Sequence, residues 1–275
     1  MITLLDGPIG SLLAERGVAT PAPLWSAAAL TSAPEVLAEM HRVYASAGAS
    51  VHTACTFRTK ERQAGPAWER LTRLAVQIAK KSVPPGHLIA GSLAPLADCY
   101  RPDLSPSDPR PEHRAMARAL ASAGVDLILC ETFPHVGEAL IAADEAAQTG
   151  LTVWVAFTAG PDGSLLSPKA MANGARSAMD LGASAVLVNC TAAASTLPFV
   201  EAIASAVGSR AQVGAYANAG GPEDWGISDI AAVSRYVEYA RCWTDAGATI
   251  VGSCCGTGPL HIAALAEEIA RRQPG

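Results

Sequence analysis

Short apolar runs rich in β-branched residues recur along the whole chain, and they are continuous rather than alternating with polar residues. Continuous runs are typical of strands that are buried on both faces of a parallel sheet. The runs predict strands at residues 2–6, 50–55, 88–95, 126–132, 152–158, 185–191, 213–218 and 249–255. Successive runs start about 35 residues apart, a fair length for one strand and one helix.

Amphipathic helical segments lie between these runs. The clearest is predicted to begin at Ser32, with Glu35 as the partner in a capping box, and its apolar positions keep helical spacing. Another is predicted over residues 259–272. Five helix ends carry a glycine just before a strand, where a left-handed residue can end the helix; these are Gly48, Gly124, Gly150, Gly182 and Gly247.

These repeated junctions indicate right-handed crossovers between parallel strands. Eight strands then favour a closed barrel over an open sheet, so the fold class is α/β, a (β/α)8 TIM barrel. No Pro/Ser-rich linker divides the chain, and we expect one domain over residues 1–275. The proline-rich stretch 100–112 is expected to be a long loop after the third strand.

Composition narrows the class of protein. The 275 residues are 50% hydrophobic, enough for a sizeable core and too apolar for a disordered chain. A net charge of −5 gives no electrostatic attraction to nucleic acid or to anionic membranes. The N-terminus lacks a basic targeting region, and no run approaches the ~20 apolar residues of a membrane span. We therefore expect a soluble cytoplasmic protein, and the composition leaves its oligomeric state open.

Unusual polar residues fall where the predicted strands end, which is the face that carries active sites in such barrels. They are Asp6, Cys55, Thr56, Cys130, Glu131, Thr132, Asn189, Cys190, Asn218, Cys254 and Cys255. An acid, several amides and the cysteines at positions 190, 254 and 255 would therefore lie together at the carboxyl end of the barrel, called its mouth below.

The adjacent Cys254 and Cys255 are the sharpest feature of the set. Neighbours in a strand point to opposite faces, so both can serve one site only where Gly256–Gly258 breaks the strand. With Cys190, two strands away, they form a three-thiolate set that suits zinc and leaves one coordination position open. Small buried filler is the alternative for each cysteine, and spacing alone leaves both interpretations open. Cys55, Cys99, Cys130 and Cys242 are interpreted as core or loop filler.

At these residues the sequence resembles the homocysteine S-methyltransferase family, whose members are zinc-dependent (β/α)8 barrels. The motifs that carry the resemblance follow the order of the family and reach from residue 6 to residue 262. They are Asp6-Gly7-Pro8-Ile9-Gly10, Gly91-Ser92-Leu93-Ala94-Pro95, Glu131-Thr132, Asn189-Cys190, Asn218-Ala219-Gly220 and the segment from Gly252 through Cys254-Cys255 to His261-Ile262.

The resemblance implies that Cys190, Cys254 and Cys255 bind Zn²⁺ and that the sulfur of homocysteine takes the fourth position. It also implies that Asp6 and Gly7 lie at the substrate site, that Glu131 pairs with the substrate ammonium, and that Asn218 contributes to binding. No catalytic residue beyond the metal site is implied. Structural alternatives are an N-cap for Asp6, an ion pair for Glu131 and a loop tie for Asn218.

The chain also departs from the family pattern. Pro8 replaces a glycine, and Arg58 and Lys60 place positive charge near the mouth, which bears on the methyl donor. His261 is expected to have a surface or helix-capping role rather than to bind metal. Trp225, after the seventh strand, is a candidate lid.

The resemblance implies methyl transfer from a small donor to homocysteine, giving methionine. S-methylmethionine is the first expected donor and S-adenosylmethionine the second, while betaine, another donor or a selenol acceptor is the alternative. Two other classes stay open: a barrel hydrolase or lyase with a cysteine nucleophile, and a zinc-binding homologue without turnover.

Overall fold

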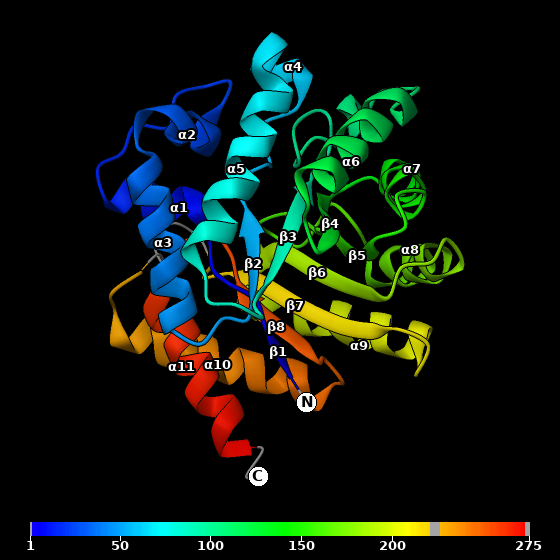
Figure 1. The fold of residues 1–275 in the computed structure, drawn as a ribbon. Coiled ribbons are helices and arrows are strands. Elements are labelled where there is room, and N and C mark those ends of the chain that lie inside the picture. The colour runs from blue at the N-terminus through cyan, green and yellow to red at the C-terminus, as the bar shows by residue number, and fades with distance from the viewer. Residues whose placement is uncertain (1, 221–225, 273–275) are drawn as a thin grey trace.

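The computed structural model describes residues 2–220 and 226–272, and its strands form one eight-stranded parallel sheet in the order β1-β8-β7-β6-β5-β4-β3-β2 (Figure 1). The strands are β1 (Thr3–Leu4), β2 (Val51–Ala54), β3 (Leu88–Leu93), β4 (Leu127–Phe133), β5 (Thr152–Phe157), β6 (Ala185–Ala192), β7 (Gln212–Asn218) and β8 (Ile250–Ser253). Each predicted strand is present, with ends that differ by at most two residues.

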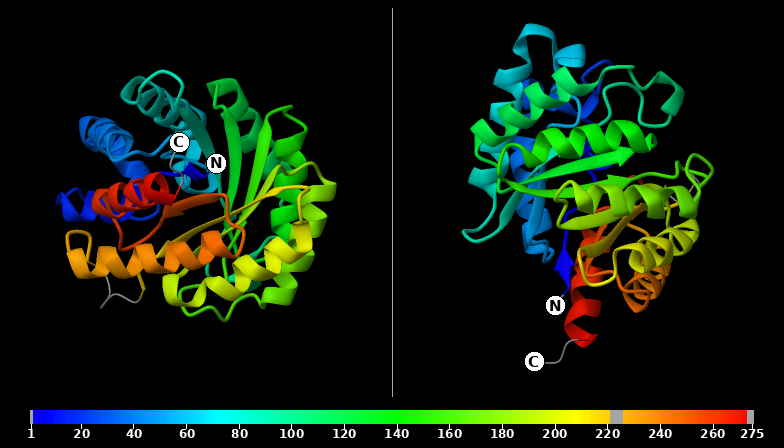
Figure 2. Two further views of the ribbon diagram at one scale, coloured as in Figure 1. Left: turned by 90° about the horizontal axis from the view of Figure 1, so that it is seen from below. Right: turned by 90° about the vertical axis from the view of Figure 1, so that its right-hand side faces the viewer.

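Helices surround the sheet on its outer side, as the view from below shows (Figure 2). The α-helices are α1 (Ile9–Glu15), α2 (Ala29–Ser32), α3 (Pro34–Ser46), α4 (Glu61–Ala64), α5 (Trp68–Ser82), α6 (Arg110–Ala123), α7 (Val136–Ala147), α8 (Pro168–Asp180), α9 (Leu197–Val207), α10 (Ile230–Asp245) and α11 (Pro259–Arg272). This arrangement is the predicted (β/α)8 barrel. None of the helices within the described ranges is long and apolar enough to cross a membrane.

The barrel closes weakly between its first two strands. β1 forms a regular ladder with β8, but its contact with β2 is a single bridge between Leu5 and Val51. Two backbone bonds support that bridge: Asp6 N donates to Val51 O at 3.0 Å, and Ser50 N donates to Leu4 O at 2.9 Å. The seam between β1 and β2 is therefore the least hydrogen-bonded part of the cylinder.

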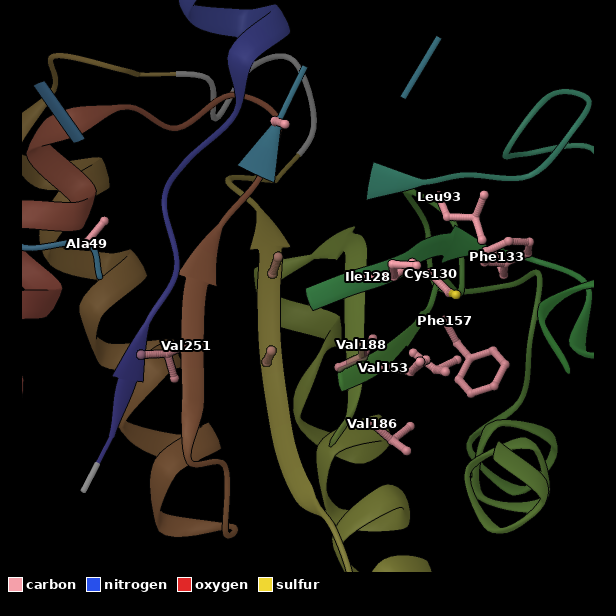
Figure 3. Close-up of a cluster of buried hydrophobic side chains, with 14 of the residues drawn as sticks. Ala49, Leu93, Ile128, Cys130, Phe133, Val153, Phe157, Val186, Val188 and Val251 are labelled. Atoms are coloured by element: carbon pink, nitrogen blue, oxygen red, sulfur yellow. The ribbon is translucent and has the colours of Figure 1, made fainter. Parts of the chain in front are cut away.

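Alternation along each strand divides the apolar side chains into two cores. One fills the barrel interior and consists of Leu5, Val51, Ala90, Leu127, Leu129, Trp154, Ala156, Ala185, Leu187, Tyr216 and Ile250. The other lies between the sheet and the helices; Figure 3 shows part of it, with Cys130 beside Leu93, Phe133 and Phe157. Inward and outward positions can thus be assigned residue by residue.

The five predicted helix-to-strand glycines all have left-handed backbone. Their φ angles lie between +79° and +105°, and each glycine is the first, second or third residue after the end of a helix. The long loop after the third strand is also present between Leu93 and Arg110, although its last predicted residues belong to α6.

The predicted capping box at Ser32 is wrong. α3 begins at Pro34 with Ala33 as its N-cap, and Ser32 is the last residue of α2, where its hydroxyl donates to Ala28 O at 3.1 Å. Proline is favoured at the first position of a helix because its φ is already helical and its missing N–H is not needed there. Pro34 therefore sets the start of the helix.

Close packing between β1 and β8 makes Gly252 sensitive to substitution. A Cβ there would lie 2.6 Å from the Cβ of Leu5, whereas a Cβ on Gly10 in α1 would meet nothing within 4 Å. We expect Gly252→Ala to lower the free energy of unfolding by about 1–3 kcal/mol through overpacking. Gly10→Ala, the matched control, should be neutral or stabilising. Urea unfolding measures the free energy of unfolding of both variants. Equal values would contradict close packing between β1 and β8 at Gly252.

Candidate metal centre and substrate pocket

Three thiols from β6 and the end of β8 meet at the carboxyl mouth of the barrel. The sulfur atoms of Cys190, Cys254 and Cys255 lie within 4.8 Å of one another. Cys190 Sγ is 2.9 Å from Cys254 Sγ, and Cys254 Sγ is 4.0 Å from Cys255 Sγ. Zinc bonds of ~2.3 Å hold sulfur ligands roughly 3.8 Å apart. The sulfur atoms of Cys190 and Cys254 would therefore move apart slightly for all three thiols to bind one zinc ion.

Cys190 reaches the mouth because the backbone turns over at its position. Leu187 points into the barrel and Val188 into the outer core, so regular alternation would direct Cys190 outward. Instead Cys190 has φ +50°, and the register between β6 and β7 shifts between Asn189 and Ala192. Such bulges re-aim side chains next to functional sites. Here the bulge brings the thiol to the other two cysteines.

A side-chain link from β4 supports this unusual backbone. Asn189 Oδ1 accepts a hydrogen bond from Thr132 N at 3.0 Å, and Asn189 Nδ2 donates to Thr132 Oγ1 at 2.7 Å. The Thr132 hydroxyl in turn donates to Cys190 Sγ at 3.8 Å. Thr132 itself has φ +62°, a strained value for a β-branched residue. Two bulged strand ends are thus tied together beside one sulfur.

Cys254 and Cys255 lie in a turn that begins where β8 ends. Cys254 N donates to Ala217 O at 2.8 Å, and Ala219 N donates to Cys255 O at 2.9 Å, so β7 and the residue that follows it hold both backbones. Gly256 has φ +79° and completes the turn. This geometry agrees with the prediction that a glycine turn lets neighbouring thiols serve one site.

Mutual contact controls ionisation of the three thiols. Hydrogen bonds with Cys254 and Cys255, together with burial, raise the pKa of Cys190 well above its ordinary value. Hydrogen bonds from Cys190 and Cys254 lower the pKa of Cys255. One thiolate can therefore form among the three, and a bound dication is needed for all to ionise together. The donor set suits a soft or borderline metal such as zinc.

Glu131 lies inside the barrel, next along the inward face of β4 after Leu129. Its carboxylate accepts hydrogen bonds from the hydroxyl of Ser92 and, at 2.9 Å, from that of Tyr216. Burial raises its pKa, and the two hydroxyl donors oppose that effect. The two hydroxyls fix the orientation of a buried acid whose remaining lone pairs are available to a cation.

Asp6 takes over the hydrogen-bonding role of a backbone carbonyl where β1 ends. Its Oδ2 accepts from Thr53 N at 2.9 Å, so the carboxylate extends the ladder toward β2. Burial raises the pKa of Asp6 to about 8, although the bond from Thr53 opposes the rise. It is not an N-cap. Gly7 is required beside it because a Cβ would lie 2.7 Å from the ring of Tyr44.

Asn218 ends β7 with its side chain almost fully buried. Its Oδ1 has no hydrogen-bond partner among the described residues. A simple loop tie would satisfy this oxygen, so the unpartnered acceptor favours a ligand role.

The two predicted cations near the mouth lie against aromatic rings. The guanidinium of Arg58 lies over Trp25 and Phe57, 5.4 and 5.5 Å from the ring centroids. Lys60 is buried, donates to Phe57 O at 2.8 Å and lies 5.2 Å from the Phe57 centroid. Burial, followed by the nearby charge of Arg58, lowers the pKa of Lys60 to about 7.

The remaining four cysteines lie outside the three-thiol group. Cys55 and Cys130 are buried in the outer core, and Cys99 lies in the loop after β3. Cys242 is exposed on α10 and is neither core nor loop, which corrects its predicted position.

His261 has the predicted capping role, since its Nδ1 accepts from Gly258 N at 3.2 Å, but it is buried and not on the surface. The candidate lid residue Trp225 lies outside the described residues.

Sequence reasoning assigned no role to several residues that shape the site: Ser92, Thr132, Asn189 and Tyr216. Three of them stand in or beside the quoted motifs, but their partners come from other strands. Tyr216 lies two residues before Asn218 on the inward face of β7, and that spacing was the available signal.

The fold and the site define the class of protein: a (β/α)8 barrel whose carboxyl mouth carries three converging thiols, a donor set that suits a metal ion. A sequence model of one family, described as Homocysteine S-methyltransferase, matches residues 3–269. The chain belongs to this family. Its activity is methyl transfer to homocysteine, the reaction for which the family is named.

Individual relatives agree with this assignment. The chain is 30% identical to Homocysteine S-methyltransferase of Escherichia coli, over 96% of this chain and 94% of that protein. It is 26% identical to S-methylmethionine–homocysteine S-methyltransferase BHMT2 of Pongo abelii, over 98% and 78%. The metallated crystal structure of homocysteine methyltransferase MmuM from Escherichia coli superposes with a TM-score of 0.79 at 25% identity, over 97% of this chain and 96% of that chain.

The link between Asn189 and Thr132 leads to a testable prediction. Partners of metal ligands typically contribute about 10- to 100-fold to metal affinity. We expect Asn189→Ala to weaken zinc binding by about that factor, measured by competition with a chelating dye. Asn173→Ala, on the exposed surface of α8, is the matched control. Unchanged affinity in the Asn189 variant would show that the link does not support the cysteine.

Proposed function

We propose that this chain is a zinc-dependent methyltransferase that moves a methyl group from a sulfonium donor to the sulfur of homocysteine, giving methionine. The observation that carries the proposal is the convergence of three thiols beside a buried carboxylate at one barrel mouth. A thiol-binding metal and an ammonium-binding acid are what homocysteine requires at its two ends.

Cys190, Cys254 and Cys255 are the residues that would hold the zinc. Zinc supplies one piece of chemistry when bound there: it keeps a substrate thiol deprotonated at neutral pH. In the overall reaction the homocysteine sulfur forms a bond to the methyl carbon while the bond from that carbon to the donor breaks. The thiol proton leaves to solvent, and the donor departs as a neutral thioether.

Glu131 is the proposed partner of the substrate ammonium. Its orientation by Ser92 and Tyr216 allows it to receive a cation without rearrangement. A pair of opposite charges ~4 Å apart interacts by about 4 kcal/mol at the effective dielectric of a protein surface region. Asp6 and Gly7 form the wall toward β1, and the unpartnered Oδ1 of Asn218 offers a further acceptor.

Charge around the mouth favours an amino-acid sulfonium as the donor. Buried acids and thiolates attract a cationic donor, while Lys60, whose ammonium has spare donors beyond the Phe57 carbonyl, can bind a donor carboxylate. S-methylmethionine carries both groups, and a relative named for that donor aligns over 98% of this chain. S-adenosylmethionine, also a sulfonium with a carboxylate, is the second donor. Betaine is the alternative on the same site.

Replacing one thiol tests the proposal. We expect Cys254→Ser to lose most bound zinc and to reduce methionine formation from homocysteine and S-methylmethionine by at least about a hundredfold. Cys242→Ser, on the exposed face of α10, should retain both. Metal analysis and a methionine assay with S-methylmethionine, S-adenosylmethionine and betaine provide the measurement.

Other outcomes identify the rival functions. Wild-type protein that keeps no zinc with all three cysteines intact contradicts the proposal. Activity that survives chelation but is lost on alkylation of one cysteine indicates a cysteine-nucleophile hydrolase or lyase. Stoichiometric zinc without turnover of any donor indicates a zinc-binding homologue.

Charge removal at Glu131 tests the ammonium contact. A hydrogen bond to a charged group contributes about 1.5–3 kcal/mol, so Glu131→Gln should raise KM for homocysteine roughly ten- to hundredfold. Zinc content should not change, because Glu131 is not a metal ligand in this account. Glu267→Gln, exposed on α11, serves as the control. An unchanged KM would assign Glu131 a purely structural role.

A further inference from the structure

A second group of potential ligands lies behind the seam where the barrel closes. His41 comes from α3, His52 from β2 and Asp6 from the end of β1. One ligand atom from each lies within 4.8 Å of the others, and all three residues are buried. His52 faces the helices rather than the barrel interior, because its neighbour Val51 points inward. The two imidazoles therefore lie outside the barrel interior, and Asp6 is the member that also borders the substrate pocket.

Both imidazoles keep an unused nitrogen in this buried place. Nδ1 of His41 and Nδ1 of His52 have no well-formed hydrogen bond to any described residue, although the backbone of Ala49 lies close enough to His52 to raise its pKa slightly against the effect of burial. A buried polar atom left without a partner costs about 1–3 kcal/mol. A ligand that binds both nitrogens would remove this cost at two atoms of one cluster. The rings approach edge to face with centroids 6.3 Å apart.

His87 prepares one of these nitrogens for a ligand. Nε2 of His52 is 3.0 Å from Nδ1 of His87, and the two rings stack at 5.3 Å. This bond occupies Nε2, which leaves the buried Nδ1 of His52 for another interaction. Histidines that bind metals characteristically use their second nitrogen in such a contact, which fixes the tautomer and the ring orientation.

Binding of a metal ion would also change the protonation of the cluster. The side chain of Asp6 accepts a hydrogen bond from Thr53 N, and burial raises its pKa to about 8, so it keeps its proton at pH 7 while the site is empty. Burial lowers the pKa of His41 to about 3 and that of His52 to about 4, so both rings are neutral at pH 7. Neutral imidazoles bind metals, and a dication would displace the proton of Asp6 and pair with the resulting carboxylate.

We propose that Asp6, His41 and His52 bind a second divalent metal ion of the zinc type, which clamps β1 to β2 and α3. Imidazole nitrogens with one carboxylate suit zinc, cobalt or nickel rather than calcium or magnesium, which prefer all-oxygen sites. Zinc–nitrogen bonds of about 2.0–2.1 Å place tetrahedral ligand atoms about 3.4 Å apart, so these atoms, now within 4.8 Å of one another, would close in by at most about 1.4 Å.

A clamp at this position has a clear structural use. The seam has one bridge and few backbone bonds, and Asp6 already extends its ladder through the side chain. A carboxylate offers about four acceptor directions, so Asp6 can bind the metal and Thr53 N and still face the substrate site. The site would fix the segment that precedes Gly7, and it does not depend on the thiol centre.

Metal stoichiometry in the intact chain tests this proposal. We expect wild-type protein to bind two equivalents of Zn²⁺ and His52→Leu to bind one. In His52→Leu reconstituted with Co²⁺, the sulfur-to-cobalt charge-transfer absorption should remain, because the cysteines are intact. His135→Asn, which keeps an acceptor at the exposed N-cap of α7, should bind two equivalents. One equivalent in both wild type and His52→Leu would overturn the proposal.

A cysteine-free background isolates the second site. The Cys190→Ser, Cys254→Ser, Cys255→Ser variant should still bind one equivalent of Co²⁺, with no sulfur-to-cobalt absorption. Adding His52→Leu should weaken that binding by at least about tenfold, and adding His87→Ala by about 10- to 100-fold. Circular dichroism confirms folding. No binding by the folded cysteine-free variant would overturn this proposal and leave the thiol centre unaffected. Wild-type protein that binds one equivalent without sulfur-to-cobalt absorption would instead contradict the proposed function.

Discussion

The chemistry of the barrel mouth depends on a reversal of strand alternation at Cys190. Regular backbone would bury this thiol in the outer core, where the neighbouring Val188 lies. The left-handed residue at the bulge brings it within reach of Cys254 and Cys255 instead. A non-glycine residue in that conformation is strained by about 1–3 kcal/mol, and the link from Asn189 to Thr132 holds it in place. The bulge in β6 thus places one of the three thiols, and the turn after β8 places the other two.

Negative charge buried in a small volume is the second organising feature. Glu131, Asp6 and the thiols all lie at or near the mouth, and burial raises the pKa of both carboxylic acids. Such a site is stable with its groups ionised only when cations enter. The proposed metal dication, substrate ammonium and sulfonium donor would each meet this requirement.

Much of the fold could be predicted because its signals are local. Continuous apolar runs mark buried parallel strands, and a glycine near each of five helix ends marks the return to the sheet. The cysteines could be placed because they stand at strand ends. The capping box failed because Pro34, two residues after Ser32, fixes the helix start more strongly. Partners such as Tyr216 for Glu131, or His87 for His52, come from distant strands and loops, and sequence spacing does not encode those distances.

The central claim is that three cysteines of this chain hold zinc and leave one position for the sulfur of homocysteine. X-ray absorption at the zinc edge, recorded with and without homocysteine, tests it most directly. In the His52→Leu variant, which isolates the thiol centre, the account predicts three sulfur neighbours and one lighter neighbour without substrate, and four sulfur neighbours with it. An environment that does not change when homocysteine is added, or one with fewer than three sulfurs at the start, would contradict the account.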